Sequence, residues 1–193
     1  MTASNNSIPV TAEIIAVGTE ILLGDLVDTN SVYLAEKLRG IGVHLHLKTA
    51  VGDNLQRLTA AIDEAHKRAD IVITSGGLGP TVDDLTREAI AAVAEVPLVY
   101  CQKFMDQIEA IFTQRGFTMS SNNRKQAYIP EGAVPIENPV GTAPCFAVEG
   151  DQGTDADGHG ISAESQGLGG IGAVPDAAGG NEANFAKKAE FAQ

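Results

Sequence analysis

The segment TSGGLGPTVDDLT, from Thr74 to Thr86, joins an apolar run to a pair of aspartates through a glycine-rich turn. The run before the turn, residues 71–74, is apolar on both faces, which is typical of a strand inside a parallel sheet. Open α/β sheets bind their ligands at the C-terminal ends of such strands. The segment therefore predicts a buried parallel strand that leads into a ligand-binding loop.

On either side of this segment, from residue 12 to about residue 100, short apolar runs alternate with helical periods. Two more strands are predicted over residues 13–17 and 43–51. Helices are predicted from about residue 29 to Gly40, along an inner face of Leu55, Leu58, Ile62 and Ala65, over residues 83–94 and over residues 102–115, with a short helix and turns from residue 120. This order predicts an α/β fold with a mostly parallel sheet and crossover helices.

Length, charge and cysteine content narrow the functional classes. A chain of 193 residues can build one α/β domain with its own core. The net charge of −12 opposes the phosphate backbone of nucleic acids, and no run of about 18 apolar residues predicts a membrane span. Two cysteines and an N-terminus without signal-peptide character favour a cytoplasmic protein. We therefore expect a small-molecule partner, and neither nucleic acid nor membrane.

The composition changes sharply near residue 150. We expect a flexible stretch over residues 1–11, a folded domain over residues 12–150 and a disordered, glycine-rich segment over residues 151–193. The sequence GLGGIG at 167–172 matches the dinucleotide pattern G-x-G-x-x-G. No predicted strand leads into it and no helix follows it at once, so we interpret the match as chance.

The glycine loop itself has two interpretations. Gly76, Gly77 and Gly79 let backbone N–H groups approach an anion, and the helix beyond adds the positive end of its dipole, which favours a phosphate cradle. The alternative is a tight strand-to-helix turn that needs positive φ angles. A Walker loop is excluded because no Gly-Lys-Ser/Thr follows.

The paired aspartates that follow the loop also have two interpretations. Carboxylates beside a bound phosphate require a divalent cation between them, so Asp83 and Asp84 suggest a magnesium-bridged phosphate. The spacing from Thr81 to Asp84 equally fits a capping box, in which the acids complement the helix dipole without any ligand. The spacing does not separate the two.

Other polar clusters follow the remaining predicted strands. They are Gly18-Thr19-Glu20, the stretch from Asp25 to Ser31 and Gly52-Asp53-Asn54. Each is explained locally as a turn or cap, with Thr29 or Asn30 capping the first long helix and Asp53 the next. In a parallel sheet, however, all of them meet at one edge, which favours a shared site.

The histidines and cysteines give weaker signals. His44 and His46 fall on one face of a predicted strand, and without a third ligand we interpret them as a solvated face rather than a metal site. Cys101 is interpreted as a helix-start or buried residue, because no histidine partner identifies it as a nucleophile.

Four ordered motifs carry a family resemblance. Residues 12–43, VGDN at 51–54, SGGLGPTVDDLTREAIA at 75–91 and NPVGTAP at 138–144 resemble the N-terminal domain of the CinA competence/damage-inducible family, over about residues 12–149. The resemblance implies a three-layer α/β/α domain of the MoaB/Mog molybdopterin-binding fold and a homo-oligomer. In CinA-like proteins this domain is associated with metal-dependent hydrolysis of the pyrophosphate in ADP-ribose. In molybdenum-cofactor relatives the equivalent pocket binds molybdopterin.

The resemblance also implies roles for individual residues. Asp53 and Asp84 match the paired aspartates of the pocket and are the expected catalytic residues and ligands of Mg²⁺ or another divalent cation. The residues expected to bind a nucleotide or pterin phosphate are Gly76, Gly77, Gly79, Thr81, Glu20, Asp28, Asn30, Asn138, Gly141 and Thr142.

The chain departs from the family pattern after these motifs. Cys145 stands where glycine is usual, and the sequence predicts neither the strand and LPGVP-type loop that complete the family pocket nor a nicotinamide-nucleotide amidase domain. Three hypotheses follow: hydrolysis of a nucleoside diphosphate sugar, pterin binding without turnover, or an inactive scaffold. The GTE, DTN and DDLT motifs favour the first.

Overall fold

The computed structural model describes residues 9–136, 138, 142–143, 145–149 and 170–174. Its strands are β1 (Thr11–Val17), β2 (His44–Val51), β3 (Ile71–Ser75), β4 (Leu98–Tyr100), β5 (Tyr128–Pro130), β6 (Val134–Ile136), β7 (Cys145–Glu149) and β8 (Gly170–Val174). Its helices are α1 (Thr19–Leu23), α2 (Thr29–Gly40), α3 (Leu55–His66), α4 (Thr86–Val93), α5 (Gln102–Gln114) and the 3₁₀ helix η1 (Ser121–Ala127).

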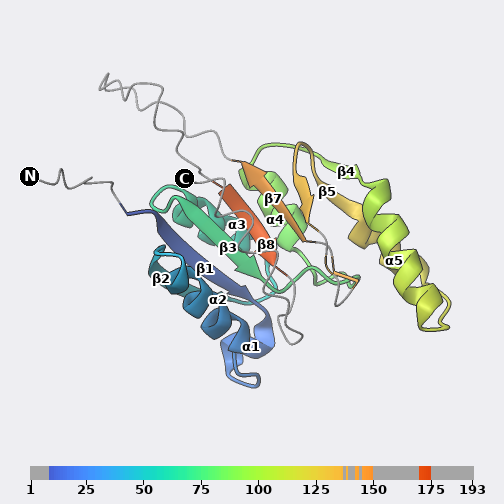
Figure 1. The fold of residues 1–193 in the computed structure, drawn as a ribbon, viewed down its shortest axis with the longest axis horizontal. Helices are drawn as coiled ribbons and strands as arrows, with labels where there is room; N and C mark the ends of the chain where they lie inside the picture. The colour runs from blue at the N-terminus through green and yellow to red at the C-terminus, as the bar shows by residue number, and fades with distance from the viewer. Residues whose placement is uncertain (1–8, 137, 139–141, 144, 150–169, 175–193) are drawn as a thin grey trace, which may run out of the picture.

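The main sheet has six strands in the order β2-β1-β3-β8-β7-β6 (Figure 1). The first four run parallel, whereas β7 and β6 pair antiparallel. Strands β4 and β5 form a separate two-stranded sheet beside α5. The predicted α/β class and the three strands β1, β2 and β3 are confirmed.

Helices cover both faces of the main sheet. Neighbouring residues of β1 point to opposite sides of the sheet, and an apolar residue on each side packs against a helix. Ile14 packs in one core cluster with Leu34 and Leu38 of α2. Ile15 packs in the other, larger cluster with residues of α3, α4 and α5, which include Leu58 and Ile90. These two clusters make the fold a three-layer α/β/α domain, as predicted.

Strand β8 lies within residues 151–193, the segment for which the sequence predicts disorder. Its backbone pairs with β3 on one side and with β7 on the other, so it lies inside the sheet. Its sequence, GIGAV, has two glycines among five residues, so it carries no apolar alternation that predicts a strand. The remaining residues of that segment, 151–169 and 175–193, lie outside the described residues, as do residues 1–8.

Helix starts also differ from prediction by one to three residues. Asp28, rather than Thr29 or Asn30, caps α2 by accepting a hydrogen bond from the Ser31 amide. Asn54 caps α3 in place of Asp53. The α4 helix begins at Thr86 and not at 83, since the two aspartates belong to the preceding loop.

The N-terminal end of the parallel strands is closed by paired charges. Glu13 of β1 is only 2% exposed and accepts hydrogen bonds from Nε and Nη2 of Arg68, at 2.5 and 2.9 Å. Beside it, Asp70 accepts from the amide and the hydroxyl of Thr11, at 2.7 and 2.8 Å.

Within the described residues, no helix is long and apolar enough to cross a bilayer.

Candidate functional site

The C-terminal ends of β2, β1 and β3 meet at one edge of the sheet. Val17 at the end of β1 pairs with Val51 at the end of β2, and Ala16 pairs with Ser75 at the end of β3. The three segments that follow these strands therefore leave the sheet side by side, at the end where α1 lies (Figure 1). This confirms the convergence expected of a parallel sheet.

Asp53 is bound to the segment that follows β1. Its Oδ2 accepts a hydrogen bond from the Thr19 amide at 3.0 Å, and its own amide donates to the Thr19 hydroxyl at 3.1 Å. The Gly18 amide donates to the carbonyl of Val51 at 2.9 Å, which fixes the same two segments at their base. Asp53 thus ties the end of β2 to the start of α1.

The first half of the glycine loop lies directly on β1. Gly76 and Gly77 have φ angles of +98° and +65°. A side chain at Gly76 would collide with the carbonyl oxygen of Val17, and one at Gly77 would collide with the hydroxyl of Thr86. Both glycines are therefore required by the turn and by close packing, as the tight-turn interpretation predicts.

The carbonyl groups of the loop all point to residues of α4. The hydroxyl of Thr86 donates to the Gly76 carbonyl at 2.8 Å, and its amide donates to that of Gly77 at 3.1 Å. Arg87 donates to the carbonyls of Leu78 and Gly79, at 2.7 and 3.0 Å. Every carbonyl of the turn from residue 76 to residue 79 is thus satisfied from beneath.

This arrangement determines where the loop amides point. In a trans peptide the N–H lies opposite the preceding carbonyl, and no described peptide bond is cis. The amides of Gly77, Leu78 and Gly79 must therefore point away from Thr86 and Arg87. Within the described chain, none of the three donates to a protein acceptor. Successive amides directed outward form the kind of concavity that binds anions.

Asp84 closes the other half of the loop. Its Oδ2 accepts hydrogen bonds from the amide and the hydroxyl of Thr81, at 2.7 and 2.5 Å. Its carboxylate also lies so close to Gly79 that a Cβ there would be 2.7 Å from Oδ2. The Thr81–Asp84 pairing predicted from a capping box is present, although it stabilises the loop that precedes α4 and not the first turn of the helix itself.

Lys125 of η1 fastens the same loop from outside. Its Nζ donates to the carbonyls of Thr81 and Asp84, at 3.0 and 2.7 Å, and lies 3.2 Å from Oε1 of Glu88. Thr81, Glu88 and Lys125 border a pocket of about 450 Å³ between the loop and η1. A residue 41 positions further along the chain therefore holds the loop, which no local pattern predicts.

Asp28 and Asn30 lie at the start of α2. Asn30 donates to the hydroxyl of Ser75 at 3.1 Å, which docks the helix on the end of β3. Asp28 lies 2.9 Å from Nζ of Lys48. Burial raises the pKa of the Asp28 carboxyl, but the hydrogen bonds from Ser31 and the charge of Lys48 outweigh burial, so the net pKa is lowered.

The other predicted binding residues are less closely joined to this site. Glu20 is exposed, and its carboxylate folds over Gly18. Asn138 is 5% exposed, and its side-chain amide donates to the carbonyl of Ala143. The side-chain amide of Gln107 donates to the backbone carbonyl of Asn138. Thr142 is partly exposed, and Gly141 lies outside the described residues.

The carboxylate oxygens of Asp53 and Asp84 are too few to hold a divalent cation by themselves and would need oxygens of a bound substrate and water. Each uses Oδ2 within the protein, and in the described structure Oδ1 of each accepts no hydrogen bond. No group of three or more His, Cys, Asp and Glu side chains among the described residues forms a metal cage. Mg²⁺ is commonly held by one or two carboxylates with substrate phosphates and water. The carboxylate of each aspartate, taken by itself, has the donor atom that this mode requires.

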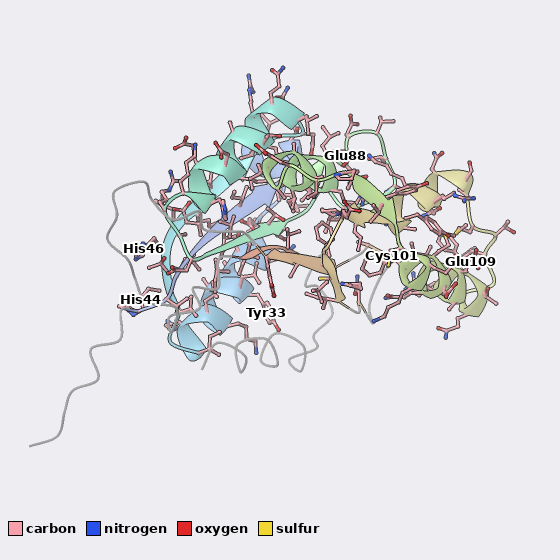
Figure 2. The ribbon with its side chains drawn as sticks, turned by 90° about the horizontal axis from the view of Figure 1, so that it is seen from above. Tyr33, His44, His46, Glu88, Cys101 and Glu109 are labelled. Carbon is pink, nitrogen blue, oxygen red and sulfur yellow. The ribbon has the colours of Figure 1, made fainter. Side chains whose placement is uncertain are left out.

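The histidines lie on an exposed strand face and Cys101 at a helix start, as their sequence interpretations expect. His44 and His46 are exposed on β2, and Figure 2 shows them far from Cys101, which precedes α5. Sequence reasoning missed Arg87 and Lys125. It placed Thr19 in the polar cluster that follows the first strand but gave it no role of its own.

Known proteins with a similar sequence agree on one family. A family model described as a probable molybdopterin binding domain matches residues 13–163. A putative competence-damage inducible protein of Halothermothrix orenii is 56% identical over 140 residues, which are 72% of this chain and 34% of that protein. A CinA-like protein of Kosmotoga olearia is 50% identical over 138 residues, with the same coverages. The chain spans about a third of the length of these curated relatives.

Solved structures agree as well. The protein CinA of Thermoplasma acidophilum, described as having unknown function, superposes with a TM-score of 0.70 at 30% identity, over 86% of this chain and 88% of that one. A putative molybdenum cofactor biosynthesis protein of Corynebacterium diphtheriae gives a TM-score of 0.55 at 16% identity, over 95% and 90% of the two chains. The second likeness shows the shared fold alone.

Proposed function

The chain belongs to the family of molybdopterin-binding domains, with CinA-like proteins among its relatives, and on this premise we propose that it hydrolyses the pyrophosphate bond of a nucleoside diphosphate sugar such as ADP-ribose. One observation carries the proposal. The carboxylate of Asp84 borders the same loop whose amides at residues 77–79 point outward. A carboxylate beside an anion-binding loop suits a phosphate that shares a divalent cation with it.

The residues of the chain have separate tasks in this proposal. The outward amides of Gly77, Leu78 and Gly79 bind one phosphate of the pyrophosphate, and Thr86 and Arg87 keep those amides in place. Asp84 and Asp53 would hold a divalent cation through Oδ1. Such a cation, when bound, polarises a phosphoryl oxygen and makes water a stronger nucleophile at neutral pH. Thr81 and Thr19 orient the two carboxylates through their hydrogen bonds.

The test is a turnover assay with the purified chain, ADP-ribose and MgCl₂. Release of AMP and ribose 5-phosphate in equal amounts, lost on addition of a chelator and restored by excess Mg²⁺, is expected. An intact substrate after prolonged incubation at high protein concentration would disprove the proposal. AMP alone without ribose phosphate would indicate a contaminating activity.

A second candidate, binding of a pterin phosphate without turnover, is favoured by the description of the matching family. The same outward amides would then bind the terminal phosphate of the pterin. Saturable binding of molybdopterin, with no product from ADP-ribose, would select this function. Binding of neither ligand would leave the inactive scaffold.

We also propose that the chain assembles with copies of itself, as the resemblance implies. The end of α1 and the turn that follows it expose four large apolar side chains, at 49 to 79%: Leu22, Leu23, Leu26 and Val27. Contiguous exposed apolar residues of this kind mark interaction surfaces. Sedimentation equilibrium is expected to give more than one chain per particle, and Val27→Asp to shift the equilibrium to monomer.

A further inference from the structure

Arg87 is the largest side chain that the described structure buries completely. It is 0% exposed, although arginine is among the residues least often buried without a partner. It belongs to the first turn of α4, whose inner face otherwise contributes apolar residues such as Ala89 and Ile90 to the core. A guanidinium in this position requires an explanation.

Its contacts are backbone carbonyls rather than carboxylates. Nη1 and Nη2 donate to Leu78 and Gly79, and Nε has no hydrogen-bond partner. No described carboxylate lies within ion-pair distance of Arg87. Asp84 is bound to Thr81, and Glu88, labelled in Figure 2, contacts Lys125 through Oε1 while its Oε2 is buried without a hydrogen-bond partner. Burial lowers the pKa of Arg87, against the weaker raising effects of Glu88 and Asp84.

A buried cation without an ion-pair partner is costly to a fold, because the desolvation of the charge is not repaid by an opposite charge. Neutral side chains could satisfy two carbonyls as well; Gln126 already reaches the Leu78 carbonyl at 3.4 Å. The positive charge of Arg87 therefore exceeds what the loop needs for its hydrogen bonds. Asp84 and Glu88 offset part of this charge from beyond ion-pair distance, and no described carboxylate pairs with it directly, so an anion from outside the described groups would complete the compensation.

The outer side of the loop offers a place for an anion that would supply such a counter-charge. Because Arg87 binds the Leu78 carbonyl from beneath, the Gly79 amide of the same peptide points outward. Gly79 itself has no side chain, and Pro80 has no amide hydrogen that would compete. An anion held by the outward amides would have the guanidinium behind it, with only one layer of backbone between them and little water to screen the attraction.

We propose that Arg87 is a positioning residue for anion binding at this loop, where its fork fixes the amides of the cradle and its buried charge is neutralised by the bound phosphate. This inference rests on the proposed function, since it assigns the pyrophosphate of the substrate to the outer face of the loop. It adds a residue that touches no substrate atom. Its effect passes through the two peptides that it holds.

The experiment measures binding of inorganic pyrophosphate to the full chain by calorimetry, with and without MgCl₂. Arg87→Met removes the charge and the fork, and Arg87→Lys keeps the charge alone. Arg39→Met, at an exposed position near the end of α2, is the control for the change in net charge. We expect at least 30-fold weaker binding for Arg87→Met, about 5-fold weaker binding for Arg87→Lys, and less than 2-fold change for Arg39→Met.

A second readout separates positioning from a purely structural role. Pyrophosphate is expected to raise the melting temperature of the wild type and of Arg39→Met but not of Arg87→Met, whatever the melting temperatures without ligand. If Arg87→Met does not fold, Arg87→Lys decides. Equal pyrophosphate affinity of the wild type and the folded Arg87 variants, or no binding by the wild type, would overturn the inference.

The two proposals fail in different ways. A wild type that binds pyrophosphate through Arg87 but leaves ADP-ribose intact would support this inference and disprove the hydrolase function. An Arg87→Met variant that hydrolyses ADP-ribose as well as the wild type does would support the hydrolase function and disprove this inference.

Discussion

The two ends of the parallel strands each enclose a buried charge, and the two charges have different surroundings. At the N-terminal end the buried Glu13 receives both arms of Arg68. The hydrogen bond to Glu13 is the main cause that raises the pKa of Arg68. At the C-terminal end the buried Arg87 receives no carboxylate, and burial lowers its pKa.

This difference separates structural from functional electrostatics in one domain. The N-terminal end is complete in itself, because Thr11, Asp70, Glu13 and Arg68 satisfy one another. Among the described residues, the C-terminal end has three loop amides without an acceptor and a guanidinium without an ion-pair partner. The first end should respond to mutation through stability alone, and the second through ligand binding and activity.

The largest expected effect comes from filling the space at Gly76. Gly76→Ala forces a side chain into a positive φ and against the Val17 carbonyl, which should cost about 4 kcal/mol of unfolding free energy. Gly42→Ala is the control, because Gly42 has a φ of +77° and nothing within 4 Å of a Cβ, and should cost about 1 kcal/mol. Urea unfolding of both variants measures the difference. Equal losses would show that the loop moves away from β1 at no cost.

Breaking the pair at the opposite end should have the next largest effect. Arg68→Met leaves the Glu13 carboxylate buried without its partner and should destabilise the fold by about 3 kcal/mol. The double variant Glu13→Gln/Arg68→Met removes the stranded charge and should recover part of that loss. Thermal unfolding of the three proteins checks this. A double variant less stable than Arg68→Met would contradict the view that an unpaired charge causes the loss.

The sequence does not predict the charge pair at the N-terminal end of the parallel strands. It predicts the site at their C-terminal end only in outline. Strands β1, β2 and β3 follow from apolar runs, and the glycine loop follows from its own composition. Arg87 lies in the helical run TREAIAAV, where a charged residue between a threonine and a glutamate is normally placed on the solvent side. Only the packing of the loop over α4 buries it.

Other features were out of reach for similar reasons. Thr29, Asn30 and Asp28 are all good N-cap residues, so the sequence does not distinguish neighbouring helix starts. The pairing of Asp53 with Thr19 joins residues 34 positions apart. Strand β8 is stabilised by hydrogen bonds to two neighbours rather than by apolar alternation, so its glycine-rich sequence resembled a disordered segment.

Comparing the two aspartates of the C-terminal end sharpens the contrast within the site. Asp84→Asn keeps the size of the side chain but removes the charge beside the loop, so metal-dependent hydrolysis should fall at least 100-fold, or about 3 kcal/mol. Asp53→Asn should lower activity as well and, because Asp53 also joins the ends of β1 and β2 through Thr19, it should in addition lower stability. Initial rates with ADP-ribose and Mg²⁺ give both numbers, and circular dichroism confirms folding. Full activity of Asp84→Asn would reduce Asp84 to a residue that closes the loop through Thr81.

The smallest expected effect concerns Asp28, which lies at the functional end but has a partner, as charges at the structural end do. Its lowered pKa means that the folded state binds the proton less tightly than the unfolded chain, whose carboxyl titrates near the ordinary value of 3.8. The stabilisation is therefore fully present above that value and is lost as the pH falls through the lower pKa of the folded state.

Asp28→Asn can still cap α2 through Ser31 but loses the charge opposite Lys48, which is itself 43% exposed. The cost should be about 0.5–1 kcal/mol at pH 7 and should shrink towards zero as the pH falls below 3.8. Urea unfolding at pH 7 and at the lowest pH where the fold persists tests this, with Asp63→Asn as the control, since Asp63 of α3 forms a more exposed pair with Lys67. A difference that grows as the pH falls would mean that the pKa of Asp28 is raised, and Asp28 would then belong with Arg87 among the charges that lack a partner.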